Sequence, residues 1–135
     1  MDYLPLDERL LKFAGSIIVL LKKIRRGPLF RPLADQLLRS GTSIGANYEE
    51  ATGAESAADF IHKMQISLKE CRETCYWLQL LVEGQLVDGD TVAPLLDEAI
   101  QLRRIFISSV NKAKARGTAS NVGTQNREGR TQNAE

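Results

Sequence analysis

This sequence has few of the residues from which reactive centres are built. Its 135 residues include one histidine, two cysteines and one tryptophan, with three tyrosines and four phenylalanines. Asp59-x-x-His62 and Glu70-x-x-Glu73 suggest a di-metal bundle, but such centres take two Glu-x-x-His pairs and a single histidine excludes the second pair. The chain has no glycine-rich phosphate loop and no zinc-ligand spacing. We therefore predict no catalytic site, no metal site and no cofactor, with His62 at a surface or interface.

Long apolar runs and a strong net charge are missing too. The longest uninterrupted apolar run spans residues 17–21, whereas a membrane helix needs about 20 such residues. Asp2, Asp7 and Glu8 do not fit an N-terminal signal peptide. The formal net charge is +1, so bulk charge favours no polyanionic partner. These absences predict a cytoplasmic protein that neither enters a membrane nor depends on bulk attraction to nucleic acid.

The two cysteines, Cys71 and Cys75, are four residues apart in a helical pattern and so share one helix face. A disulfide within one helix closes little chain and fits poorly. We predict free, buried thiols in a reducing compartment. With no cation expected beside them, they would stay protonated and inert.

What the sequence does have is helical periodicity. Apolar residues recur at three- and four-residue steps and predict helices over about residues 6–26, 32–52, 57–83 and 91–114. No strand pattern competes. Long helices joined by short connections predict an all-α protein, an up-down-up-down antiparallel four-helix bundle formed by residues 1–116. Residues 117–135 are polar and glycine-containing, which predicts a disordered C-terminal tail.

The middle of the second helix, residues 40–47, has poor helix propensity. It is either a loop between two short helices or a helix whose small residues let a neighbour approach closely. The apolar spacing of Leu37, Ile44, Tyr48 and Ala51 continues through it and favours the helix.

Three stretches carry a family resemblance: residues 39–51 (RSGTSIGANYEEA), 59–64 (DFIHKM) and 67–78 (SLKECRETCYWL). Together they resemble the bacterial four-helix-bundle family of 23S rRNA intervening-sequence proteins, some of which are encoded within inserts in large-subunit rRNA genes. The family is similar to the accessory protein of diversity-generating retroelements, a pentameric barrel that associates with a reverse transcriptase and nucleic acid. The resemblance, over roughly residues 5–115, implies a homopentamer of four-helix bundles and no enzyme. This sequence departs from the retroelement type in being near neutral rather than strongly basic.

Polar residues at helical spacing face each other across the second and third helices. They predict a hydrogen-bonded layer that fixes the register of the two helices, and the alternative is a solvated face. The residues of this predicted polar layer are Arg39, Ser43, Asn47, Ser67 and Glu70.

Trp77 lies about 100° from the core stripe that contains Cys75 and Leu78. Large aromatics off the core face are typical of interfaces. The third helix would then have a second apolar face and self-associate through it, unless one broad core stripe holds all these residues. The predicted interface residues are Ile66, Tyr76, Trp77 and Leu80.

Basic residues gather at the end of the first helix and along the fourth helix, with Arg103 and Arg104 in its middle. Phosphate contact is one interpretation, and ordinary helix-end charge with solvated faces is the other. The candidate phosphate contacts are Lys22, Lys23, Arg25, Arg26, Arg103 and Arg104. The sequence predicts a homo-oligomeric interaction protein associated with RNA or ribonucleoprotein, and the family resemblance implies that the oligomer is a pentamer. The alternatives are a nucleic-acid-binding accessory factor for an enzyme such as a reverse transcriptase and, less favoured, a metal-dependent bundle enzyme.

Overall fold

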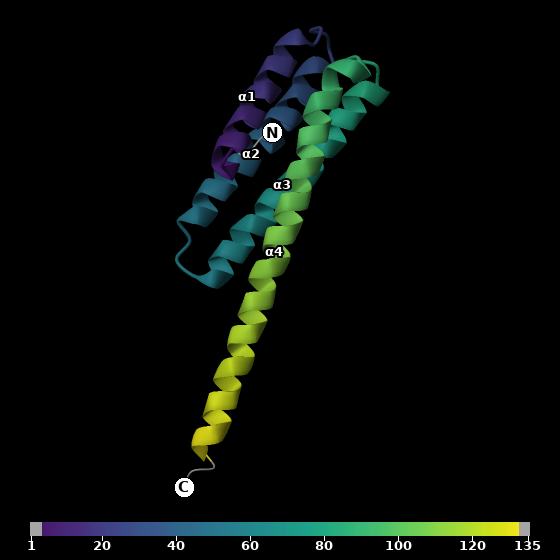
Figure 1. Cartoon of the computed structure of the whole chain (residues 1–135). Helices are drawn as coiled ribbons and strands as arrows, with labels where there is room; N and C mark the ends of the chain where they lie inside the picture. The colour runs from purple at the N-terminus through teal and green to yellow at the C-terminus, as the bar shows by residue number, and fades with distance from the viewer. Residues whose placement is uncertain (1–3, 133–135) are drawn as a thin grey trace.

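The chain forms four helices and, in the part described here, no strand. The computed structural model describes the backbone of residues 4–132 and the side chains of residues 4–118. The helices are α1 (Leu6–Lys23), α2 (Phe30–Thr52), α3 (Ala57–Glu83) and α4 (Gly89–Gln132) (Figure 1). The predicted all-α, four-helix fold is confirmed.

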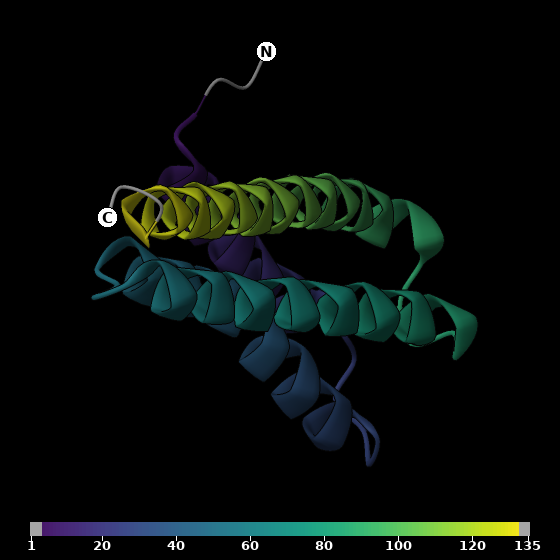
Figure 2. The same ribbon diagram turned by 90° about the horizontal axis from the view of Figure 1, so that it is seen from below.

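The helices pack around the bundle in chain order. α2 contacts α1 and α3, and α4 contacts α3 and α1. Figure 1 shows consecutive helices running in alternating directions, which is consistent with the up-down-up-down order. In Figure 2, α3 and α4 lie alongside each other and the first turns of α2 lie farthest from them. None of the described helices has the length and hydropathy needed to cross a bilayer.

Each helix contributes one apolar stripe to a single core. The stripes repeat at three- and four-residue steps, as amphipathic helices require. The buried apolar residues are Leu10, Phe13, Ile17, Leu20, Ile24, Leu37, Ile44, Ala51, Met64, Cys71, Cys75, Leu78, Leu81, Val92, Ala99, Leu102, Phe106 and Val110.

The small residues in the middle of α2 bring that helix against α1. Residues 40–47 are helical, so the helix interpretation is confirmed. A Cβ added at Gly41 would lie 3.0 Å from Cγ1 of Ile17, and one added at Gly45 would lie 3.3 Å from Cβ of Leu10. Two glycines one turn apart therefore give α1 room to approach the α2 backbone, which offsets their poor helix propensity.

Both ends of α3, the start of α1 at Leu6 and the end of α2 at Thr52 agree with the sequence prediction, and the other helix ends differ from it. α3 has the predicted bounds, and the Ser56 hydroxyl accepts the Asp59 N–H at 3.0 Å, a helix N-cap. α1 ends at Lys23, three residues early, because Ile24 is extended. α2 begins at Phe30, two residues early.

α4 extends well beyond its predicted end near residue 114. It continues to Gln132, and Figure 1 shows its second half projecting past the other helices. A helix propagates through local backbone hydrogen bonds, whereas the sequence argument for a disordered tail rested on the lack of burial. Residues 133–135 of that predicted tail lie outside the described residues, and disorder of residues 117–135 in solution stays a prediction.

Candidate interaction surfaces

An ion-pair cluster joins α2 to α3. The Arg39 guanidinium lies 3.0 Å from Oε2 of Glu70 and also pairs with Glu73. Its Nη2 donates to Oε1 of Gln36 at 3.4 Å. The Glu70 side chain is only 17% exposed, so the arginine both neutralises it and ties the two helices together. Arg39 and Glu70 are thus adjacent, as the predicted polar layer requires.

The other members of that layer make separate bonds. Ser67 is buried, and its hydroxyl donates across the seam to the Ile44 carbonyl at 3.0 Å. The Asn47 amide donates to the Ser43 carbonyl at 2.8 Å, and the Ser43 hydroxyl donates to the Arg39 carbonyl. Both bonds lie within α2, where the carbonyl four residues earlier is the nearest acceptor. The structure therefore shows one ion-pair cluster, one buried cross-helix bond and two bonds within α2.

The aromatic pair on α3 is divided between core and surface. Trp77 is half-buried against the core, and its Nε1 donates to Oε1 of Glu73 at 3.1 Å. Tyr76 is 57% exposed and meets Trp77 edge-on, with ring centroids 5.2 Å apart. Ile66 and Leu80 are half-buried. Trp77 is thus partly used inside the subunit, and Tyr76 is the aromatic that remains open to solvent.

A groove runs beside Tyr76, between the end of α3 and the start of α4. It has a volume of about 580 Å³. Leu80, Val92 and Leu96 contribute apolar surface to it, and Gln79 and Glu83 contribute polar groups. An open, largely apolar groove next to an exposed tyrosine suits the apolar side chains of another protein surface.

The candidate phosphate contacts fall into two separated groups. Lys22, Lys23, Arg25 and Arg26 are exposed at the C-terminal end of α1, where the Arg26 guanidinium lies 5.7 Å from the Phe30 ring centroid. The other group, on α4, comprises half-buried Arg103 and exposed Arg104. These two follow closely after Glu98, which pairs with Arg9 near the start of α1. The two groups therefore lie toward opposite ends of α1 and form no single basic surface.

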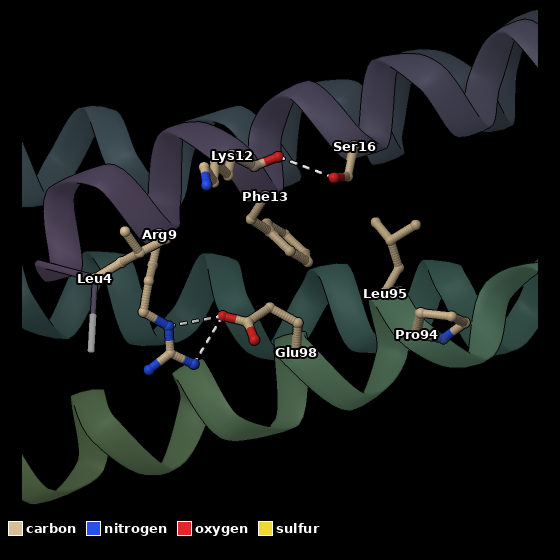
Figure 3. Close-up of a pocket in the computed structure, with 8 residues that line it drawn as sticks. All are labelled: Leu4, Arg9, Lys12, Phe13, Ser16, Pro94, Leu95 and Glu98. Carbon is tan, nitrogen blue, oxygen red and sulfur yellow. Dashed lines mark hydrogen bonds and ion pairs between the residues drawn. The ribbon is translucent and has the colours of Figure 1, made fainter. Parts of the chain in front are cut away.

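A smaller pocket lies between α1 and α4 (Figure 3). Its volume is about 320 Å³, and Phe13 and Leu95 form apolar walls. Arg9 donates to Oε1 of Glu98 at 2.9 Å from Nε and 2.7 Å from Nη2. The Ser16 hydroxyl donates to the Lys12 carbonyl at 3.0 Å. In this pocket Arg9 is already paired with Glu98, and Ser16 has no histidine or carboxylate base beside it. The residues that line the pocket therefore do not form a nucleophile–base pair.

Both cysteines are free and buried, as predicted. The Cys71 Sγ lies 3.2 Å from the Ala99 carbonyl oxygen. A hydrogen bond with Cys75, together with burial, raises the pKa of the Cys71 thiol. The same bond, aided by the Arg103 charge and opposed by burial, lowers the pKa of Cys75 to about 7. The charge of Arg103, on α4, lowers the pKa of both thiols, and the sequence prediction of thiols without a cationic neighbour did not include this residue.

His62 is exposed near the start of α3. Among the residues whose side chains are described, no three His, Cys, Asp or Glu side chains gather as metal ligands would.

Comparison with known proteins identifies a family and a similar solved structure. The model of the 23S rRNA-intervening sequence protein family matches residues 8–108. The chain belongs to this family. A crystal structure from Bacteroides thetaiotaomicron, of a protein of unknown function from the S23 ribosomal protein family, is 36% identical, with a TM-score of 0.70, and the match covers 77% of this chain and 96% of that one. No curated protein matches significantly.

The family match covers most of the bundle and stops inside α4. It begins at residue 8, early in α1, and ends at residue 108, two residues before Val110, the last buried apolar residue of the described side chains. The projecting end of α4 is therefore outside the part of the chain that the 23S rRNA-intervening sequence protein family model describes. The family resemblance predicted from residues 39–78 is confirmed.

In this member of the 23S rRNA-intervening sequence protein family, the sequence argument overlooked an apolar surface on α1. Leu11 is 76% exposed, Val19 51% and Ile18 43%. The sequence feature that could have indicated this surface is the apolar run at residues 17–21. Five consecutive residues cover more than one helical turn, so they cannot all face the core, and Ile18 and Val19 point outward. We call the outward residues Leu11, Gly15, Ile18 and Val19 the α1 face.

Proposed function

We propose that this chain is a cytoplasmic, non-enzymatic, homo-oligomeric interaction protein of the 23S rRNA intervening-sequence type. Its copies associate through contacts in which the outer side of α3 is one of the two surfaces, and they hold partners, RNA or ribonucleoprotein, on the assembled surface. Five copies is the number that the family resemblance implies.

The exposed Tyr76 beside an apolar groove is the observation that carries this proposal. A tyrosine presents a large, rigid and amphipathic surface at little conformational cost, which is why interfaces favour it. Leu80 extends the same surface into the groove. Trp77, with its N–H held by Glu73, gives that surface a rigid base.

The residues that line the groove beside Tyr76 and the α1–α4 pocket support the non-enzymatic part of the proposal. The groove beside Tyr76 is lined mainly by apolar groups, with Gln79 and Glu83 as its polar side chains. General acid–base or nucleophilic catalysis needs a positioned pair of reacting groups. The buried thiols lie away from both this groove and the α1–α4 pocket, since neither is lined by a cysteine.

The self-association is tested with a Tyr76→Asp, Leu80→Asp double variant. Two carboxylates placed in an apolar contact lose solvation without gaining partners, so the variant should dissociate to a 15.0-kDa chain. Sedimentation velocity and light scattering measure the mass, and circular dichroism verifies that the helices remain. Asn111→Asp, a change at another exposed position, should keep the wild-type mass. A wild-type chain that is monomeric at micromolar concentration would contradict the proposal.

A second candidate function is direct nucleic-acid binding as an accessory factor to an enzyme. It is favoured by one observation, the four exposed cations at the end of α1, Lys22, Lys23, Arg25 and Arg26. A ring of copies would repeat this group and multiply its attraction for phosphate.

Charge reversal at Arg25 and Arg26 separates the two candidates. If the cations bind phosphate, an RNA shift assay should show binding that weakens steeply between 50 and 200 mM salt, as expected for about four phosphate contacts. Arg25→Glu with Arg26→Glu should then weaken binding roughly tenfold or more at the lower salt. Reversal of Arg72, an exposed arginine of α3 that is not among the candidate phosphate contacts, is the control. Wild-type binding that is absent or insensitive to salt would remove this second candidate.

A further inference from the structure

We propose that Cys71 and Cys75 hold one soft metal ion, Cu(I), between their sulfurs inside the bundle. The proposed function does not use these thiols, so this site goes beyond it. The sequence prediction of no metal site rested on the absence of di-metal and zinc motifs, which take four or more ligands. A two-coordinate ion needs only two. Three features carry the site: the spacing of the thiols, their burial, and an arginine that has no ion pair among the described residues.

The spacing of the two thiols fits a bridging ion better than a disulfide. Cys71 and Cys75 are one turn apart among the buried residues of α3, and side chains at this spacing have Cβ atoms about 5–6 Å apart. A disulfide needs Cβ atoms about 3.8 Å apart and sulfurs about 2 Å apart. Two metal–sulfur bonds of about 2.3 Å each, arranged in a line, hold the sulfurs about twice as far apart. A metal ion therefore spans the distance that one helical turn sets.

The two thiols are neighbours with few other ligands around them. They are hydrogen-bonded to each other, and the Cys71 Sγ lies 3.2 Å from the Ala99 carbonyl oxygen. Among the side chains that the structure describes, no histidine or carboxylate joins the cysteines in a group of three possible ligands. Two sulfurs cannot complete the tetrahedral shell of zinc, whereas thiolates select Cu(I).

Burial of the pair sets a requirement on charge. The exposed fractions of Cys71 and Cys75 are 0% and 3%. Binding exchanges the two thiol protons, which go to solvent, for one Cu(I), and the oxidation states of sulfur and copper do not change. The resulting copper bis-thiolate has one net negative charge. An anion inside a protein is costly unless a cation balances it, so the site needs one positive charge.

Arg103 supplies that charge. It lies on α4 one turn after Ala99, whose carbonyl contacts Cys71, and its charge lowers the pKa of both thiols. The arginine is half-buried and takes part in none of the ion pairs of the described residues. A half-buried cation without a carboxylate partner is costly while the thiols are neutral. The anionic copper complex gives it a counter-charge.

Copper titration of the full chain tests the site. Under nitrogen, the reduced protein should take up one Cu(I) per chain in competition with bicinchoninate, a colorimetric Cu(I) chelator. X-ray absorption should show two sulfur ligands and no nitrogen ligand. Zinc should not displace the copper, because zinc takes four ligands. Failure to retain Cu(I) against the chelator, nitrogen ligation, or displacement by zinc would overturn the proposal.

Single cysteine substitutions locate the ion. Cys71→Ala and Cys75→Ala should each weaken Cu(I) binding by at least about a hundredfold, since removal of a ligand costs more than removal of a group outside the ligand set. The helical circular dichroism of each variant is compared with that of wild type. Wild-type affinity in either variant would mean that the copper lies elsewhere, against this inference.

Arg103→Leu tests the counter-charge with both sulfurs in place, and so does not depend on how well the cysteine variants fold. It should weaken Cu(I) binding about tenfold, as loss of a group outside the ligand set does. Arg104→Leu, which removes an exposed arginine from the next position of α4, is the matched control and should bind as wild type does. Equal affinities of the two variants would contradict the role of Arg103.

The site lies within one chain and is separate from the assembly through α3. The Tyr76→Asp, Leu80→Asp double variant should therefore bind one Cu(I) per chain with wild-type affinity, whether or not its mass changes. Loss of copper from that variant would place the ion between subunits and contradict this inference. Absence of copper binding in the wild-type chain would leave the proposed self-association unaffected.

Discussion

Replacing Phe106 by alanine is expected to lower the free energy of unfolding by about 4 kcal/mol. Phe106 is fully buried on α4, and its ring and that of Tyr48 from α2 form a T-shaped pair with centroids 6.2 Å apart. The substitution removes the apolar surface and leaves a cavity that the four surrounding helices can close only in part. Such a loss is a large share of the stability of a small domain. Urea titration followed by circular dichroism measures it.

Truncation of the chain after Arg116 is the matched comparison on the same helix. Val110 is the last buried apolar residue among the described side chains, so removal of residues 117–135 should change the free energy of unfolding by less than about 0.5 kcal/mol. A truncated chain that loses as much stability as the Phe106→Ala variant would show that the C-terminal part of α4 belongs to the folded core, against the predicted domain boundary at residue 116.

Gly41→Leu is expected to cost about 3 kcal/mol. Even the first added carbon would lie 3.0 Å from Cγ1 of Ile17, and Ile17 is itself fully buried. Ile17 has no free space to move into, so α1 must shift away from α2 and lose packing along its length. The loss should appear as a lower urea midpoint with an unchanged dependence of the unfolding free energy on urea.

Gly15→Leu makes the same chemical change on the other side of the neighbouring helix. Nothing lies within 4 Å of a Cβ at Gly15, and leucine has the higher helix propensity. At protein concentrations where copies do not associate, this variant should be as stable as wild type or more stable by up to about 1 kcal/mol. Equal losses for Gly41→Leu and Gly15→Leu would mean that α1 and α2 do not approach closely at Gly41.

Much of the fold was predictable because the helices are amphipathic. The bounds of α3 followed from its apolar spacing, from Ser56 as N-cap and from Gly84 at its end. α2 was predictable through its weak centre because Leu37 and Ile44 keep helical spacing across the glycines. The far end of α4 was not, because a local helix needs no burial and burial was the basis of the prediction.

The contacts at the candidate surfaces were less predictable, because each polar side chain has several possible hydrogen-bond partners within its reach. The sequence predicted correctly that Arg39 and Glu70 lie together between α2 and α3. Asn47, however, donates to the Ser43 carbonyl one turn earlier in α2 rather than to α3. Trp77 was expected on an open face, yet its N–H is held by Glu73 and its ring is half-buried. A single helix pattern specifies an angle, whereas the depth of burial depends on the neighbouring helix.

By itself the sequence determined the four amphipathic helices of the bundle but not the far end of α4, together with the chain order of the helices, the close approach at the α2 glycines and the family. These properties depend on spacing along the chain, which the residues carry locally. Only the tertiary structure decided that Tyr76 rather than Trp77 is the open aromatic, that the charge of Arg103 acts on the buried thiols and that α1 presents Leu11, Ile18 and Val19 to solvent. Each of these depends on which helix covers which side chain, and that is settled when the four apolar stripes close on one core.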